Sequence, residues 1–280
     1  MLFVLSILEE NRPLIDRRRL EAILREAGRI ALAGWPGDGH ALDVWNKSPD
    51  NPVTAIDLAV DEYLKSELQK LLPAAGWLSE ETTDAPARLD GQLVWLVDPI
   101  DGTRDFIRGR DGWAVSVALV SAARPLLGYL YAPGRRRDEG GEFWHAQAGK
   151  GAWRNGERLI ASKRTELRGA RVPSHQLSEE NADLVAVNQP NSIALRMAMV
   201  AADEADFVAT LRWGFEWDIA AAGLIAREAG AAVTDAFGNP LNFNKRNPRS
   251  FGVLVTSTAI HGAAVERLAE RAQALSKLDQ

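Results

Sequence analysis

The sequence predicts a protein of mixed α and β structure in two parts, an α+β part up to about residue 160 and an α/β part over residues 161–280. Three observations lead to this prediction. Two segments with apolar residues at helical spacing come first, and a run of short strand-like segments separated by turn residues follows them. Beyond residue 160, strand-like and helix-like segments alternate. A chain of 280 residues is long enough for two domains of ordinary size.

Two amphipathic helices are expected near the N-terminus. The first begins at Arg17 and ends where Gly34 follows, and the second comes after the polar stretch 46–52 and ends before Pro73. Their apolar residues recur three and four positions apart, as Leu20, Ile23, Leu24, Ala27, Ile30 and Ala31 in the first helix, and as Ile56, Ala59, Val60, Tyr63, Leu64 and Leu68 in the second. The run 1–8 lacks the basic residues and cleavage site of a signal peptide, so we interpret it as the edge of a helix.

Strands are expected in the rest of the first part. The run 93–97 is apolar throughout, which is typical of a strand buried on both faces, and it leads directly into Asp98. Further strands of an antiparallel meander are expected at 113–120, 125–131, 141–145 and 151–154. The dipeptide 155–156 (Asn-Gly) is a hairpin turn sequence, and the arginines 135–137 are interpreted as a solvated hairpin tip.

The second part alternates between the two kinds of element. We expect strands at 183–188, 207–211, 231–235 and 251–256, and helices at 193–202, 218–229 and 259–275. Gly230 follows the second of these helices, where glycine is the usual C-terminal cap.

Composition restricts the available chemistry to carboxylates. The chain has no Cys, which excludes disulfides, thiolate nucleophiles and Cys-ligated metal sites. With only four His, a metal would have to rely on oxygen ligands, which favour Mg²⁺. The net charge of -5 gives no basic field for a nucleic acid polymer, and no segment approaches the ~20 apolar residues that span a membrane. We therefore expect a cytoplasmic protein with neither a nucleic acid polymer nor a membrane as partner.

Acidic residues at the ends of expected elements are the candidates for a functional site. Residues 98–103 (Asp-Pro-Ile-Asp-Gly-Thr) place two carboxylates on a tight turn at the end of a strand, where backbone amides are also free. Residues 79–81 (Ser-Glu-Glu) add an acidic pair, and Asp218 adds a carboxylate at the start of a helix. Each also has an ordinary interpretation: the Asp-Pro and Asp-Gly pairs as turn dipeptides, Glu80 and Glu81 as a solvated loop, and Asp218 as a first-turn residue. Together they favour a shared cation, because gathered carboxylates repel one another without one.

Two rival functions differ in how well the sequence supports them. A P-loop nucleotidase would need Gly at position 144 and Ser or Thr at position 151, where the chain has Trp144 and Gly151. A non-catalytic protein that binds a structural cation remains an alternative if the metal has no open coordination position. An assay for phosphatase activity with Mg²⁺ and with EDTA separates this alternative from an enzyme.

With these motifs, the sequence resembles the inositol monophosphatase-like family of Mg²⁺-dependent, lithium-sensitive phosphomonoesterases, which includes the 3'(2'),5'-bisphosphate nucleotidases. The matching segments occur in family order at 47–57, 79–81, 95–103 and 217–230. Ser79 departs from the pattern, because many relatives have Gly there. The resemblance implies a layered αβαβα sandwich of two domains, residues 1–160 and 161–280, with the site in the cleft between them.

The resemblance also implies a role for individual residues in a site with two or three Mg²⁺ ions. The implied metal ligands are Glu80, Asp98 and the Ile100 carbonyl for one ion, and Asp98, Asp101 and Asp218 for a second. Asp57 and the Thr103 hydroxyl would activate the attacking water, with Glu81 as a supporting catalytic residue. The implied substrate-binding residues are Lys47, Glu80, Asp101, Gly102, Thr103, Arg196 and Asp218.

The choice of substrate depends on the segment before Asp218. Inositol monophosphatases have a Glu where this chain has Leu211. Bisphosphate nucleotidases instead carry a Lys near the position of Arg196, a cation able to bind a second phosphate. The alternative interpretation of Arg196 is a solvated helix residue. Residues 103–106 resemble the nucleotidase form, although 191–193 departs from it. The sequence therefore predicts adenosine 3',5'-bisphosphate as substrate, with inositol 1-phosphate or a broader set of sugar phosphates as the alternative. A homodimer is compatible with the resemblance, and the sequence does not decide the oligomeric state.

Overall fold

The structure is a computed structural model that describes residues 15–39, 44–48 and 51–278, with the side chains of residues 45–53 left outside the description. The helix edge expected at 1–8 and the side chain of Lys47 therefore lie outside the described part. No helix within that part is long and apolar enough to cross a membrane.

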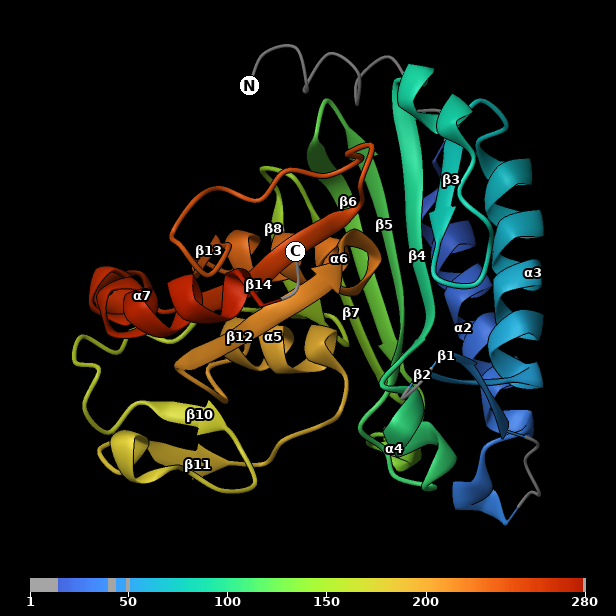
Figure 1. The fold of residues 1–280 in the computed structure, drawn as a ribbon. Helices are drawn as coiled ribbons and strands as arrows, with labels where there is room; N and C mark the ends of the chain where they lie inside the picture. The colour runs from blue at the N-terminus through green and yellow to red at the C-terminus, as the bar shows by residue number, and fades with distance from the viewer. Residues whose placement is uncertain (1–14, 40–43, 49–50, 279–280) are drawn as a thin grey trace.

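A seven-stranded sheet forms the centre of the first part (Figure 1). Its strands are β3 (Gly76–Ser79), β4 (Leu93–Asp101), β5 (Ala114–Ser121), β6 (Arg124–Ala132), β7 (Glu142–Gln147), β8 (Gly151–Arg154) and β9 (Glu157–Arg158), and they lie side by side in this order. β3 and β4 pair in parallel and all later neighbours pair antiparallel. The predicted meander is confirmed.

Two long helices, α2 (Arg17–Ala33) and α3 (Ala55–Leu71), cover one face of this sheet (Figure 1). The Asp16 side chain caps α2 by accepting from the Arg18 N–H, and Thr54 caps α3. Most of the apolar residues predicted on one face of each helix pack against the sheet: Leu20, Leu24, Leu64 and Leu68 lie in one cluster with Trp95, Val97 and Val115. The prediction is wrong for Ala59, which is exposed because it lies on the side of α3 turned away from the sheet. The hairpin of β1 (Val44–Ser48) and β2 (Asn51–Thr54) leads into α3.

The other face of the sheet is covered by α6 (Glu216–Glu228), and α5 (Ile193–Ala201) packs beside α6. A second sheet lies on these helices in the order β12 (Phe207–Phe215), β14 (Arg249–Thr256), β13 (Ala232–Thr234), and α7 (His261–Ser276) covers its outer side. Helices, sheet, helices, sheet and helix thus follow one another across the molecule (Figure 1). The predicted αβαβα sandwich is confirmed.

Strand pairing in the second part is mainly antiparallel. Both neighbours of β14 run antiparallel to it, and a parallel pair is formed by β10 (Arg171–Pro173) with β11 (Val185–Val187). One apolar cluster joins residues of the large sheet, such as Val94 and Leu130, to α5 and α6. The domain division near residue 160 stays a prediction.

The shorter elements connect these layers. The short helix α4 (Thr103–Ile107) follows the 98–103 motif and had no sequence signal of its own. The 3₁₀ turns are Pro36–Asp38, Pro86–Asp90, Arg137–Glu139, Glu179–Asn181 and Thr258–Ile260.

Candidate active site

The 98–103 motif forms a tight turn at the end of β4. Pairing with β5 is interrupted between Asp98 and Asp101, so this part of the chain leaves the regular ladder. An Asp98 oxygen accepts the Ile100 N–H (3.1 Å), and the Ile100 carbonyl accepts the Thr103 hydroxyl (3.1 Å). Gly102 has φ of 100°, and an added Cβ would lie 2.7 Å from the carbonyl oxygen of Gly112. Only glycine fits this turn without displacing its neighbours.

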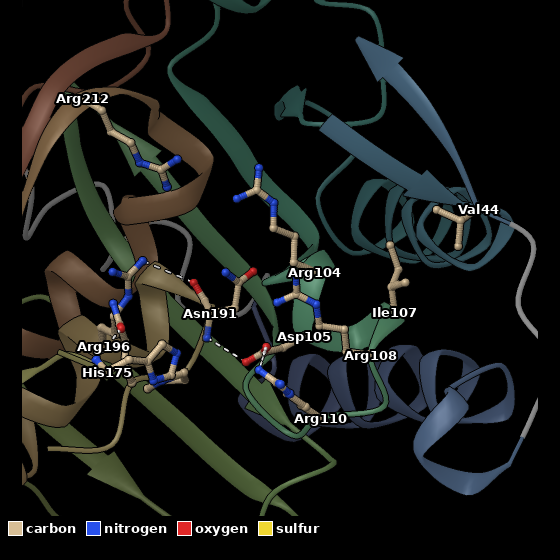
Figure 2. Close-up of a pocket in the computed structure, with 12 residues that line it drawn as sticks. Val44, Arg104, Asp105, Ile107, Arg108, Arg110, His175, Asn191, Arg196 and Arg212 are labelled. Carbon is tan, nitrogen blue, oxygen red and sulfur yellow. Dashed lines mark hydrogen bonds and ion pairs between the residues drawn. The ribbon is translucent and has the colours of Figure 1, made fainter. Parts of the chain in front are cut away.

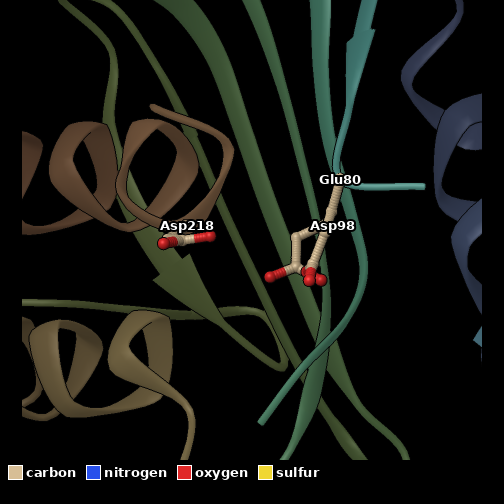
Figure 3. Close-up of side chains that lie close together, drawn as sticks. All are labelled: Glu80, Asp98 and Asp218. Carbon is tan, nitrogen blue, oxygen red and sulfur yellow. The ribbon is translucent and has the colours of Figure 1, made fainter. Parts of the chain in front are cut away.

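Three of the predicted metal ligands meet at the ends of different elements. Glu80 follows β3, Asp98 lies on β4, and Asp218 lies in the first turn of α6 (Figure 3). One carboxylate oxygen from each lies within 4.8 Å of the other two. Small side-chain movements would let a divalent cation, or a closely spaced pair, contact all three oxygens. The structure thus brings together residues that are up to 138 positions apart in the sequence.

The acidic group is electrostatically unfavourable without a cation. Burial raises the pKa of Asp98 well above its usual value, and the nearby carboxylates of Glu80, Asp101, Asp218 and Asp57 raise it further. Burial also raises the pKa of Asp218, with Glu80 and Asp101 adding to the effect. A divalent cation would compensate this repulsion, and the all-oxygen donor set fits Mg²⁺.

Asp101 lines the same cleft but is bonded to the start of α5. One of its oxygens accepts the Ser192 hydroxyl (2.5 Å) and the Ala194 N–H (2.7 Å), and the other accepts the Ile193 N–H (3.3 Å). Burial raises the pKa of Asp101 to about 6 despite these hydrogen bonds. Among the described residues, Asp101 is not part of the group of three, and its role as a metal ligand stays a prediction.

Asp57 and Thr103 lie close to this group, and Glu81 follows Glu80 in the chain. Asp57 is buried in the first turn of α3, where its carboxylate accepts the Thr54 N–H (2.8 Å) and the Thr54 hydroxyl (2.5 Å). Its contribution to the pKa of Asp98 places it within electrostatic range of the metal ligands. Thr103, Gly102 and Ile100 line the cleft. Glu81 is half-buried beside Glu80.

The loop that carries Glu80 is held by Asp61 and Thr82, two residues that the sequence analysis left out. Asp61, buried on α3, accepts hydrogen bonds from the hydroxyls of Ser79 and Thr82. Ser79 Oγ also accepts the Glu81 N–H (3.4 Å). The serine that departs from the family pattern therefore ties the end of β3 to α3. Asp61 lies four residues after Asp57, a helical spacing that could have indicated a shared face.

The start of α6 is held by a second polar network. Buried Glu216 accepts the backbone N–H groups of Asn244 (2.5 Å) and Lys245 (3.1 Å). The buried Arg88 guanidinium donates to the Asn244 side chain (2.5 Å), the Lys245 carbonyl (2.9 Å) and Asp84 (2.6 Å). This network connects the segment after Glu80 to the helix that carries Asp218, and the sequence analysis did not identify it.

The acidic cleft has a volume of about 300 Å³ and adjoins a larger cavity of about 860 Å³. Arg104, Asn191 and Arg212 line both of them. Arg196 lines the larger cavity (Figure 2), where its guanidinium donates to the carbonyls of Ser192 (3.4 Å) and Asn191 (3.3 Å). The predicted second-phosphate residue therefore lies beside the acidic cleft, and its role stays a prediction.

Comparison with known proteins identifies the family. Residues 17–277 match the Inositol monophosphatase family. The chain belongs to this family. Over 237 residues it is 33% identical to the 3'(2'),5'-bisphosphate nucleotidase CysQ of Escherichia coli K12, with 80% of this chain and 92% of that protein covered. It is 30% identical to the fructose-1,6-bisphosphatase/inositol-1-monophosphatase of Thermotoga maritima over 234 residues, which cover 80% of this chain and 86% of the relative.

The fold agrees with this assignment. The solved structure of the Thermotoga maritima IMPase TM1415 superposes with a TM-score of 0.78 at 28% identity, and the match covers 93% of this chain and 100% of the other. Members of the inositol monophosphatase family are Mg²⁺-dependent phosphatases, and this protein is a phosphatase.

Proposed function

We propose that this phosphatase hydrolyses a nucleoside 3',5'-bisphosphate, such as adenosine 3',5'-bisphosphate, to the 5'-monophosphate and inorganic phosphate. The observation that carries the proposal is the acidic cleft with its group of three carboxylates, which opens into a cavity lined by arginines. The first feature suits the metal and the reacting phosphate, and the second suits a further phosphate on the same substrate. The identity to the E. coli bisphosphate nucleotidase supports this choice of substrate.

Glu80, Asp98 and Asp218 would hold Mg²⁺, with Asp101 and the Ile100 carbonyl as further ligands in a site of two or three ions. When bound, Mg²⁺ lowers the pKa of a coordinated water and neutralises the leaving oxygen. Asp57 and the Thr103 hydroxyl would orient the attacking water and accept its proton at the Asp57 carboxylate, with Glu81 supporting them. The protein's task is thus to position the water and the phosphate and to stabilise negative charge.

Leu211 and the arginines of the larger cavity favour a nucleotide over an inositol phosphate. Leu211, at the position where inositol monophosphatases have an acid that binds the inositol hydroxyls, packs against the apolar cluster of Ala236 and Phe251. An apolar side chain cannot hydrogen-bond a polyol. The larger cavity, by contrast, is lined by Arg196 and other arginines. An inositol with one phosphate has no second anion to pair with them, whereas a nucleoside bisphosphate has one.

The deciding experiment compares two substrates on the purified protein. We expect kcat/KM for adenosine 3',5'-bisphosphate to exceed that for inositol 1-phosphate, and both rates to disappear with EDTA and return with Mg²⁺. Inhibition by Ca²⁺ and Li⁺ would accompany this behaviour. Full activity in metal-free buffer would overturn the mechanism, and a higher kcat/KM for inositol 1-phosphate would overturn the choice of substrate.

A further inference from the structure

The larger cavity has an unusual concentration of positive charge for this protein. Five arginines line it, Arg104, Arg108, Arg110, Arg196 and Arg212, whereas the chain as a whole has a net charge of -5. Asp105 is the single acidic residue among the described residues that line the cavity. Arginines gathered around a concave space repel one another and attract anions. The cavity therefore has the electrostatic character of an anion site.

The arginines divide into two walls that face each other across Asn191 (Figure 2). On one wall, Arg196 is half-buried, its guanidinium donates to the carbonyls of Asn191 and Ser192 just before α5, and burial lowers its pKa. On the other wall, Arg104, Arg108 and Arg110 extend from α4 and the loop after it, and all three are exposed. The second wall is thus better placed to meet a ligand from solvent.

The one carboxylate in the cavity does not neutralise this second wall. Asp105 is buried and accepts the backbone N–H of Asn191 (3.0 Å), which fixes it toward the protein. Its ion pair with Arg110 is long, at 3.8 Å, and the Arg110 side chain remains 58% exposed. Within the described part of the chain, the structure shows no hydrogen bond or ion pair for the Arg108 side chain. Two guanidinium groups therefore keep most of their donors for a ligand.

We propose that Arg108 and Arg110, with Arg104 between them and the acidic cleft, form a second anion site that binds the phosphate group of the substrate that is not hydrolysed. The inference rests on the proposed function, because it assigns the residues that recognise the second anion. Arginine suits this task, since its planar fork binds two oxygens of a tetrahedral anion at once.

The spacing along α4 supports this assignment. Thr103 lies at the start of α4 in the acidic cleft, and Arg108 lies five residues later in the larger cavity. Five residues at helical rise advance about 7.5 Å along the axis. The two phosphates of a nucleoside 3',5'-bisphosphate are joined through one ribose ring, so they are separated by a distance of this order.

Substrates that differ only in the second phosphate test the proposal. The double variant Arg108→Gln/Arg110→Gln should lower kcat/KM for adenosine 3',5'-bisphosphate by roughly 10- to 100-fold, mainly through KM, because charge-assisted hydrogen bonds are lost. Its kcat/KM for adenosine 3'-monophosphate should stay within about twofold of wild type. The matched control is Arg19→Gln, an exposed arginine on α2, across the large sheet. Equal losses for both substrates would overturn the proposal.

A binding measurement separates this inference from the proposed function. In EDTA, wild type should bind adenosine 5'-monophosphate more tightly than adenosine in isothermal titration calorimetry, and added salt should weaken this preference. The double variant should lose most of this preference. If the preference is the same in variant and wild type, the second anion site is wrong even when the enzyme is active. If wild type hydrolyses neither substrate with Mg²⁺, the proposed function fails, and the binding comparison still decides the anion site.

Discussion

Gly128 lies where the backbone of helix α6 packs directly against the large sheet, and changing it to alanine should loosen that contact. A Cβ at this position of β6 would lie 2.6 Å from the carbonyl oxygen of Ala221 and 3.1 Å from its Cα. Both are backbone atoms of α6, so no side-chain rotation can relieve the overlap. The helix has to move away from the strand, and Asp218 in its first turn moves with it.

The expected loss of stability follows from this geometry. Overpacking a core by one methyl group costs typically about 1–3 kcal/mol, and we expect about 2–3 kcal/mol because the obstacle is backbone. For a chain of this size, such a loss lowers the melting temperature by roughly 4–12 °C. Because Asp218 moves relative to Glu80 and Asp98, the Mg²⁺ concentration for half-maximal activity should also rise.

Gly223→Ala provides a matched control on the same helix. Its added Cβ would lie 3.7 Å from the side chains of Met197 and Val233, an ordinary van der Waals contact. Replacing glycine inside a helix should then stabilise the protein by about 0.5–1 kcal/mol. Thermal unfolding and Mg²⁺-dependent activity of both variants decide the matter. If Gly128→Ala melts at the wild-type temperature, or if both variants lose the same stability, the packing argument is refuted.

Three further predictions concern the site and the pH dependence of stability. Asp98→Asn should abolish activity, because a metal ligand is lost. Its melting temperature in EDTA should equal or exceed that of wild type, because a buried carboxylate with a raised pKa is removed. A lower melting temperature would contradict this. Asp57→Asn and Thr103→Ala should each lower kcat by orders of magnitude, and the double variant should lower kcat little further, because the two residues act on one water. If the losses in the double variant add, the two residues have separate roles. Burial raises the pKa of Asp206, but hydrogen bonds from Arg171 and Ser162, with the charge of Arg171, outweigh this and lower it from the usual 3.8 to about 2. The carboxylate therefore contributes about 2 kcal/mol above pH 4, lost as the pH falls toward 2, and denaturant titrations of Asp206→Asn should lack that loss.

Local patterns in the sequence determined the elements and the chemistry of the acidic residues. The spacing of apolar residues predicted α2 and α3. Residues three and four positions apart lie on the same face of a helix, so a short stretch of sequence is enough to show the buried face. The Asp-Pro and Asp-Gly pairs likewise predicted a turn at residues 98–103, and in the structure Gly102 has the left-handed conformation that this turn requires. The αβαβα arrangement came from the resemblance of several such motifs in one order, and the structure confirms it.

The tertiary structure alone decided which distant side chains share an environment. Asp101 meets Ser192 across 91 positions, and Arg88 meets Asn244 across 156, so no local pattern could indicate either contact. Arg108 looked like one more charged residue in the sequence, and only the approach of Asn191 and Arg196 from the second part makes its surroundings a cavity. The physical reason is that hydrogen bonds and charges act through space over a few ångströms, whereas the sequence records neighbours along the chain. Folding brings separate acidic and basic residues together as an acidic cleft and an adjoining cavity lined by arginines.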